Sequence, residues 1–183
     1  EGFLTAMPFL RDHARLTPGQ SILINGASGN IGSVAVQIAK DMGTEVTGVA
    51  SAANRDLVLS LGADKFIDYG TEDFTTHKGR YDVIFDAVGK SGFSRAKPAL
   101  KSHGVYMTTV PSLAIVLPTL RAAKAKGKRG LLATTGLRSL EDKKKDLALL
   151  STMIEAGKLR CVIDRTYPLE NIAEAHAYVE TGR

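Results

Sequence analysis

The sequence predicts an α/β domain: a doubly wound parallel sheet with helices on both faces. Short apolar runs alternate with helical patterns along most of the chain. A glycine-rich turn at residues 26–32 joins the first apolar run to an amphipathic helix. The 183 residues, 44% of them hydrophobic, are enough to bury one core, so we expect a single domain over residues 1–183.

The first part of the chain alternates between helix and strand. Phe3, Met7, Leu10 and Ala14 share one helical face, and the break at residues 17–19 ends this opening helix. Beyond it, short apolar runs predict strands, and apolar residues three and four apart predict helices. The expected strands span residues 21–24, 45–50, 65–68, 81–86, 105–110 and 131–135, and the expected helices span 31–42, 54–61, 92–100 and 113–125.

Two helices are expected in the last part of the chain. Ser139 and Asp142 have the spacing of a capping box, which predicts a helix start, and Gly157 ends that helix. An extended piece at residues 161–163 leads to a final helix that stops at Gly182. Because the chain starts in one helix and ends just past another, we expect a fragment of a larger protein. The predicted buried stripes are Leu147, Leu150 and Ile154 in the first helix, and Ile172, Ala175, His176 and Val179 in the second.

Composition excludes several classes of protein. The apolar runs, such as residues 113–117, are too short to span a membrane. The single cysteine, Cys161, excludes an internal disulfide and a thiolate zinc cluster. It favours a reducing cytoplasmic location. We expect its side chain to be buried as a small hydrophobic group. The net charge of +5 comes with basic clusters that lack interleaved aromatic residues, so we expect solvated surface and no nucleic-acid partner. These clusters are Lys124, Lys126, Lys128 and Arg129, and Lys143, Lys144 and Lys145.

The glycine turn has the chemistry of a phosphate site. Its glycines follow the pattern Gly-x-x-Gly-x-x-Gly between a strand and a helix, where a dinucleotide fingerprint has to lie. A pyrophosphate binds bare backbone N–H groups at the positive end of a helix dipole. Gly26 would allow the sharp exit from the strand, Gly29 the approach of the phosphate, and Gly32 the close packing of the helix.

The end of the second strand favours NADP(H) over NAD(H). An NAD-binding fold places an acidic side chain there, on the ribose 2′-hydroxyl, but Glu45 lies at the opposite end of this strand. Ser51, Asn54 and Arg55 follow instead, and hydroxyl, amide and guanidinium groups suit a 2′-phosphate. The alternative is that Asn54 and Arg55 only begin a solvated helix.

Residues 18–32 resemble the medium-chain dehydrogenase/reductase superfamily, and the long glycine turn resembles its zinc-independent quinone-oxidoreductase-like branch. The resemblance covers nearly the whole chain. It implies a Rossmann domain, with the family's GroES-like catalytic domain and closing C-terminal strand outside residues 1–183. It also implies a homodimer through the edge strand at residues 131–136. Further matching segments are residues 46–51, 61–64, 67–69, 81–89, 155–158, 162–165 and 167–169.

The resemblance also implies a set of cofactor-binding residues, all after predicted strands. The pyrophosphate would lie on Ser28, Gly29, Asn30 and Ile31, with Gly26 and Gly32 shaping the turn. The sequence departs from many relatives in having Ala52 and Ala53 directly after Ser51, so that Arg55 is the nearest cation. The 2′-phosphate and adenosine would contact Ser51, Arg55 and Tyr69, and the nicotinamide would lie near Val88, Gly89, Thr109, Val110 and Pro111.

We expect no catalytic or metal-ligating residue in this chain. Ser28 lacks the Gly-x-Ser-x-Gly pattern of a nucleophile elbow, and Asp86 is interpreted as a carboxylate that binds backbone at a strand end. Glu1 alone does not make a metal site. The four histidines, at positions 13, 77, 103 and 176, share no ligand spacing.

The expected function is cofactor binding in an NADPH-dependent reductase of quinones, enones or other activated double bonds. Two alternatives stay open. One is the cofactor domain of a zinc-type alcohol dehydrogenase or an enoyl reductase. The other is a module that binds NADP(H) without catalysis.

Overall fold

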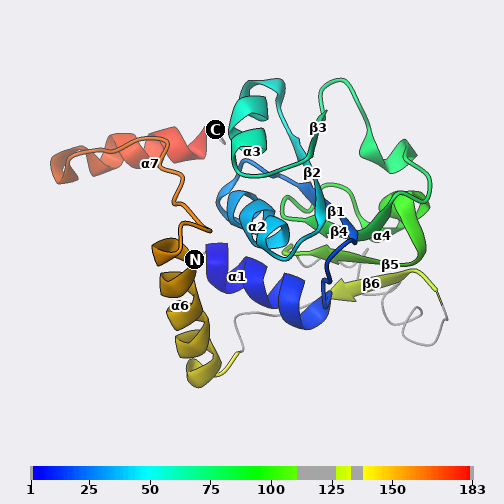
Figure 1. The fold of residues 1–183 in the computed structure, drawn as a ribbon. Coiled ribbons are helices and arrows are strands. Elements are labelled where there is room, and N and C mark those ends of the chain that lie inside the picture. Colours follow the sequence, from blue (N-terminus) through cyan, green and yellow to red (C-terminus); the bar gives the residue numbers. More distant parts are fainter. Residues whose placement is uncertain (1, 111–126, 133–137, 182–183) are drawn as a thin grey trace.

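The computed structural model describes residues 2–110, 127–132 and 138–181. Six parallel strands form one sheet in the order β3-β2-β1-β4-β5-β6 (Figure 1). Consecutive strands add outward from β1 on one side and outward from β4 on the other, so the direction of winding reverses between β1 and β4. The strands are β1 (Ser21–Asn25), β2 (Glu45–Ala50), β3 (Lys65–Asp68), β4 (Tyr81–Asp86), β5 (Leu100–Thr108) and β6 (Arg129–Leu132).

Helices cover both faces of this sheet, as predicted. One face packs against α1 (Gly2–Pro8), which continues as a π-helical turn over Phe9–His13, and against α2 (Asn30–Asp41) and α3 (Arg55–Ser60). The other face packs against α4 (Phe93–Ala96) and the 3₁₀ turns Phe74–Thr76 and Lys97–Ala99. Toward the C-terminus, α6 (Leu140–Glu155) lies beside α1, and α7 (Ile172–Glu180) extends away from the sheet (Figure 1).

Alternating side chains of the strands fill two cores, one on each face. In β1, Ile22 and Ile24 point toward α1 and α2, while Leu23 between them points to the opposite face. Phe85 and Ile84 divide in the same way on β4. Each such side chain, fully removed from water, stabilises the fold by about 1.5–3 kcal/mol. The middle strands are therefore apolar on both faces, which is why they read as continuous apolar runs.

The predicted positions of β2, β3 and β4 are confirmed to the residue. The fifth strand begins at Leu100 instead of Val105, because an isolated pairing of Tyr81 with Leu100 precedes the regular ladder that starts at Val83 and Val105. The polar residues between those pairings hid this start. The helix expected at residues 113–125 and the strand residues 133–135 lie outside the described residues.

The capping box is confirmed. The predicted buried stripe of α6 is confirmed at Leu150 and wrong at Leu147 and Ile154. Ser139 Oγ accepts a hydrogen bond from the Asp142 backbone N–H at 3.1 Å. Leu147 and Ile154 are 49% and 50% exposed. The helix is rotated by about one position because Asp146 is buried in ion pairs with Arg11 and Arg138. The face that packs on the core consists of Asp146, Leu149, Leu150 and Met153.

Two further expectations for the C-terminal part are wrong. No residue of α7 is buried, and Ile172, His176 and Val179 of its expected inner face are exposed. Cys161 is exposed as well. It lies in a segment without regular structure, where residues 161–163 form no strand. Residue type and helical spacing predicted both, but the described residues cover neither the exposed residues of that helix face nor Cys161. In the described part of the chain, every helix is too short or too polar to cross a bilayer.

Candidate functional site

The turn between β1 and α2 is shaped by two of its glycines. Gly26 has a φ of +82°, and its N–H and that of Ala27 both donate to the Val49 carbonyl at 3.0 Å. A Cβ on Gly32 would lie 2.0 Å from the Gly26 carbonyl oxygen, closer than any real contact. Helix α2 thus begins directly against the turn, which only glycine at both positions allows.

Gly29 has a different explanation. Its φ of −76° and ψ of 172° suit any residue, and a Cβ there would meet only the Gly26 carbonyl oxygen, at 3.4 Å. Folding does not require glycine at this position. Gly29 is exposed and is the N-cap of α2, and it provides no side-chain cap. A bare backbone at an exposed, uncapped helix start is what a closely approaching anion needs.

The first N–H groups of α2 remain available for such an anion. The earliest hydrogen bond of the helix runs from the Ser33 N–H to the Gly29 carbonyl, at 2.8 Å. In the part of the chain that the structure describes, the N–H groups of Asn30, Ile31 and Gly32 have no acceptor. Helix α2 is 12 residues long, so its dipole adds positive potential at this end. The turn therefore fits a pyrophosphate.

The ends of β1, β4 and β5 meet at this turn. A Cβ on Gly26 would lie 2.5 Å from Val88 Cγ2, and a Cβ on Gly89 would lie 2.5 Å from Val110 Cβ. Thr109 Oγ1 donates to the Ala87 carbonyl at 3.4 Å. Val88 and Val110 are 41% and 42% exposed, so this edge offers apolar surface beside the turn. Pro111, expected at the same place, lies outside the described residues.

A buried carboxylate organises the loop after β4. Asp86 is fully buried and accepts five hydrogen bonds. The strand-end role predicted for it is confirmed, but the sequence did not reveal its side-chain partners. Burial and the neighbouring Asp86 carboxylate raise the pKa of Tyr106 far above its usual value, so this hydroxyl stays a donor. The five donors are Asn25 Nδ2 (2.9 Å), the N–H groups of Val88 (3.0 Å), Gly89 (2.9 Å) and Ser91 (3.1 Å), and the Tyr106 hydroxyl (2.8 Å).

The ends of β2 and β3 carry the remaining expected contacts. Asn54 Nδ2 donates to Ser51 Oγ at 3.1 Å, and the Arg55 guanidinium carbon lies 5.4 Å from the centre of the Phe66 ring. Tyr69 is 66% exposed, and its N–H donates to the Ala50 carbonyl. Asp68, which no sequence pattern marked, is paired with Ala50 and so lies beside the ends of β2 and β3. Its Oδ1 accepts from the Gly70 N–H at 3.0 Å.

The expected site residues that the structure describes thus lie at the carboxyl ends of parallel strands, on the turns that follow them, or in the first turn of the next helix. This is where an open α/β sheet binds ligands, above all where the winding reverses, here between β1 and β4. Metal binding has no comparable geometry: the described residues include no group of three or more His, Cys, Asp or Glu side chains close enough to hold an ion. The described residues do not fit a zinc site. Glu1 lies outside them.

A family model described as zinc-binding dehydrogenase matches residues 61–183, well over half of the chain. This chain belongs to that family. It is 33% identical to a chloroplastic quinone oxidoreductase of Triphysaria versicolor over 95% of this chain and 54% of the relative. It is 32% identical to a chloroplastic NADPH-dependent alkenal/one oxidoreductase of Arabidopsis thaliana over 90% of this chain and 38% of the relative.

Solved structures agree with this family. The quinone oxidoreductase from Coxiella burnetii superposes with a TM-score of 0.82 at 30% identity, covering all of this chain and 55% of that one. The predicted resemblance to quinone-oxidoreductase-like members of the medium-chain dehydrogenase/reductase superfamily, and the Rossmann fold, are thereby confirmed. The chain spans about half the length, or less, of these relatives.

Proposed function

We propose that this chain is the NADP(H)-binding domain of an oxidoreductase that reduces quinones, enones or other activated carbon–carbon double bonds. The observation that carries the proposal is Gly29: a glycine that folding does not require, at an exposed and uncapped helix start, where the winding of the sheet reverses. The family and its NADPH-dependent relative support the cofactor. When bound, NADPH supplies the hydride, and the chain holds and orients it.

Each part of the edge has its own role in this proposal. Ser28, Gly29, Asn30 and Ile31 hold the pyrophosphate on the turn and the start of α2. Ser51 and Arg55 bind the 2′-phosphate, and Tyr69 lies beside the adenosine. Val88 and Gly89 contact the nicotinamide from the loop after β4, which Asp86 holds through three backbone N–H groups. Thr109, Val110 and Pro111 contact it from the end of β5.

We assign no catalytic acid, base or metal ligand to this chain. We propose that catalysis needs a GroES-like domain and a closing strand outside residues 1–183, and that the reaction does not use zinc. The chain alone then binds cofactor without turnover. Turnover of a quinone by this chain alone would contradict that proposal.

Assembly and location are also part of the proposal. Strand β6 ends the sheet order, and an edge strand offers unpaired backbone groups to a second copy. We therefore propose a homodimer through β6 and the residues up to 136. Light scattering at micromolar concentration tests this, and a monomer would contradict it. The cytoplasmic location depends on the single cysteine alone and stays a prediction.

Calorimetric titration of the chain with NADPH and with NADH tests the central proposal. We expect tighter binding of NADPH, and Arg55→Gln should reduce that preference about tenfold while leaving NADH binding unchanged. Gly29→Val should weaken both cofactors at least tenfold, because its side chain occupies the place of the phosphate. The backbone at position 29 accepts valine, so the variant should melt at the same temperature as the wild type. Unchanged affinity in Gly29→Val would refute the site.

A further inference from the structure

The amino-terminal edge of the sheet contains an irregularity that the cofactor site does not use. Tyr81 of β4 pairs with Leu100 of β5, but the next pairing joins Val83 to Val105. Residues 101–104 therefore bulge out of the ladder. A bulge re-aims side chains and leaves backbone unpaired. The bulged side chains of Lys101, Ser102 and His103 are exposed, at the opposite end of the strands from the glycine turn.

This bulge opens a cavity of about 250 Å³. Polar groups from separate parts of the chain converge on it, among them Arg129 at the start of β6 and Gln20 just before β1. Gln20 Oε1 accepts from the Thr17 N–H at 3.0 Å, which leaves the side-chain NH₂ free of that bond. The cavity is smaller than the roughly 300 Å³ at which drug-sized ligand sites begin, so it suits a small ligand. Its polar lining is Gln20, Asp82, Lys101, Ser102, His103 and Arg129.

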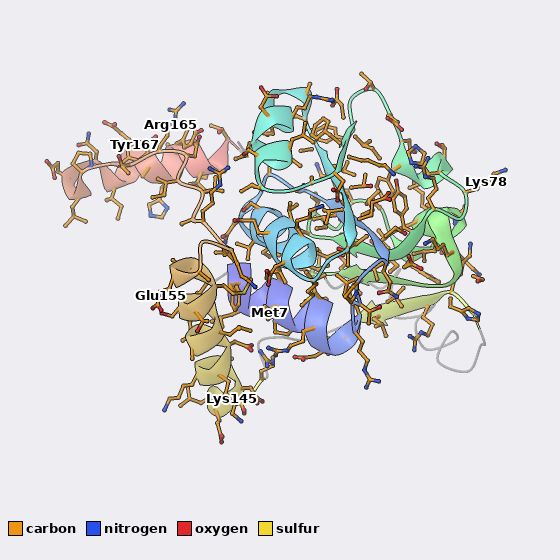
Figure 2. The ribbon with its side chains drawn as sticks, viewed as in Figure 1. Met7, Lys78, Lys145, Glu155, Arg165 and Tyr167 are labelled. Carbon is orange, nitrogen blue, oxygen red and sulfur yellow. The ribbon has the colours of Figure 1, made fainter. Side chains whose placement is uncertain are left out.

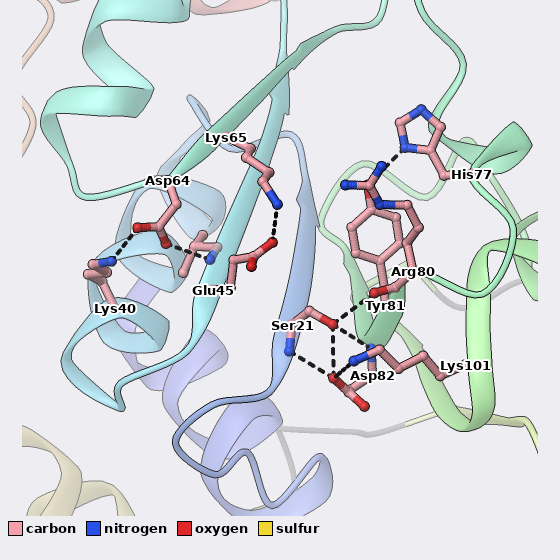
Figure 3. Close-up of polar contacts among 11 residues, drawn as sticks. Ser21, Lys40, Glu45, Asp64, Lys65, His77, Arg80, Tyr81, Asp82 and Lys101 are labelled. Carbon is pink, nitrogen blue, oxygen red and sulfur yellow. Dashed lines mark hydrogen bonds and ion pairs between the residues drawn. The ribbon is translucent and has the colours of Figure 1, made fainter.

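The lining has one carboxylate, and that group already has partners. Asp82 Oδ2 accepts from the Ser21 N–H (2.8 Å), the Ser21 hydroxyl (2.9 Å) and the Lys101 ammonium (2.6 Å), as Figure 3 shows. Burial alone would raise the pKa of Asp82, but the hydrogen bonds from Lys101 and Ser21 outweigh burial and lower it. Asp82 thus stays ionised and serves as an internal counter-ion.

The remaining donors carry a surplus of positive charge. An ammonium has three N–H donors, and Asp82 takes one of those of Lys101. Arg129 and His103 make no side-chain hydrogen bond or ion pair to residues 2–110, 127–132 or 138–181. A guanidinium with unused donors beside an ammonium binds an oxyanion well, because both hydrogen bonds are charge-assisted.

We propose that this cavity binds a small oxyanion, a phosphate or carboxylate, between Lys101, His103 and Arg129. Gln20 and Ser102 donate further hydrogen bonds from the rim. The site is separate from the proposed cofactor site at the carboxyl ends of the strands, since it lies at the amino ends of β4, β5 and β6. The bulge explains why it exists: a regular β5 would leave no room for it.

Backbone NMR with inorganic phosphate tests this proposal. The titration is run at constant ionic strength, with NADPH present to fill the glycine turn. We expect saturable shifts in the amides of residues 101–105 and 129–130. The double variant His103→Gln/Arg129→Gln should bind phosphate at least tenfold more weakly. Both replaced side chains are exposed, so the fold should persist, which the remaining amide shifts report directly.

A matched control removes two exposed cations from α6, as Lys144→Gln/Lys145→Gln, and should bind phosphate as the wild type does (Lys145 is labelled in Figure 2). A parallel titration with phenyl phosphate distinguishes a free anion from a phosphate group on a larger ligand: weaker binding indicates the former, and equal or tighter binding the latter. Shifts that never saturate, shifts confined to residues 26–32, or unchanged affinity in His103→Gln/Arg129→Gln would each overturn the proposal.

Discussion

Removing the Asp86 carboxylate should destabilise the fold more than truncating any other side chain at the proposed cofactor site. Asp86→Ala deprives five donors of their acceptor. The backbone donors of residues 88–91 lie on a partly exposed loop and can turn to water. Tyr106 and Asn25 are only 0% and 9% exposed, so their donors to Asp86 cannot turn to water, and Asn25 Nδ2 keeps only a long bond of 3.4 Å to Ser91 Oγ.

An unsatisfied buried donor costs about 1–3 kcal/mol. Two such donors, together with weaker hydrogen bonding of the backbone N–H groups of residues 88–91, give an expected destabilisation of about 3–5 kcal/mol for Asp86→Ala. Asp86→Asn keeps the volume and one acceptor oxygen, so we expect about 2 kcal/mol. Urea unfolding followed by circular dichroism measures both values.

The Tyr106→Phe variant isolates the contribution of the Tyr106–Asp86 hydrogen bond from that of the other four bonds to Asp86. Alone it removes one donor to Asp86 and one acceptor of the Gly92 N–H, at a cost of about 1–2 kcal/mol. Combined with Asp86→Ala it should add little, because the orphaned hydroxyl is gone, which gives a coupling of about 1 kcal/mol. An Asp86→Ala variant within 1 kcal/mol of wild type, or additive effects of the two changes, would refute this reasoning.

Three further predictions concern the rest of the chain. Gly32→Ala should destabilise by about 3 kcal/mol, because the new Cβ strikes the Gly26 carbonyl, whereas Gly29→Ala should be neutral or slightly stabilising; equal urea midpoints would contradict this contrast. Asp146→Ala should lower the free energy of unfolding by about 2–3 kcal/mol, because Arg11 and Arg138 lose their buried partner. A smaller loss of stability in Asp146→Ala than in the exposed Glu141→Ala would contradict this prediction. Hydrogen bonds from Thr75 and then Arg95 lower the pKa of Asp73 to about 2. The contribution of this carboxylate to stability is therefore complete above pH about 4 and is lost as pH falls toward 2. Asp73→Asn should flatten the dependence of stability on pH in that window, and an unchanged dependence would contradict this prediction.

The order of the elements could be predicted because each depends on a local pattern. The runs that became β2, β3 and β4 have apolar residues at their centres and polar or charged residues at or beside their ends, so their limits matched the structure. The glycine turn could be predicted equally well, since its spacing and its place between strand and helix are both features of the sequence. The roles of Gly26 and Gly29 differ only in conformation and in what surrounds them, and these the sequence does not contain.

Long-range contacts decided the rest. Asp86 meets Tyr106 and Asn25 because three strands align in register, and nothing near Asp86 in the sequence marks those partners. The rotation of α6 follows from the burial of Asp146 against Arg11, far away along the chain. The sequence by itself determined the α/β class, the winding and the turn, because helix and strand periods and glycine freedom are local. Only the tertiary structure decided which charges are buried, which apolar faces stay exposed, and where the bulge at the start of β5 opens a cavity.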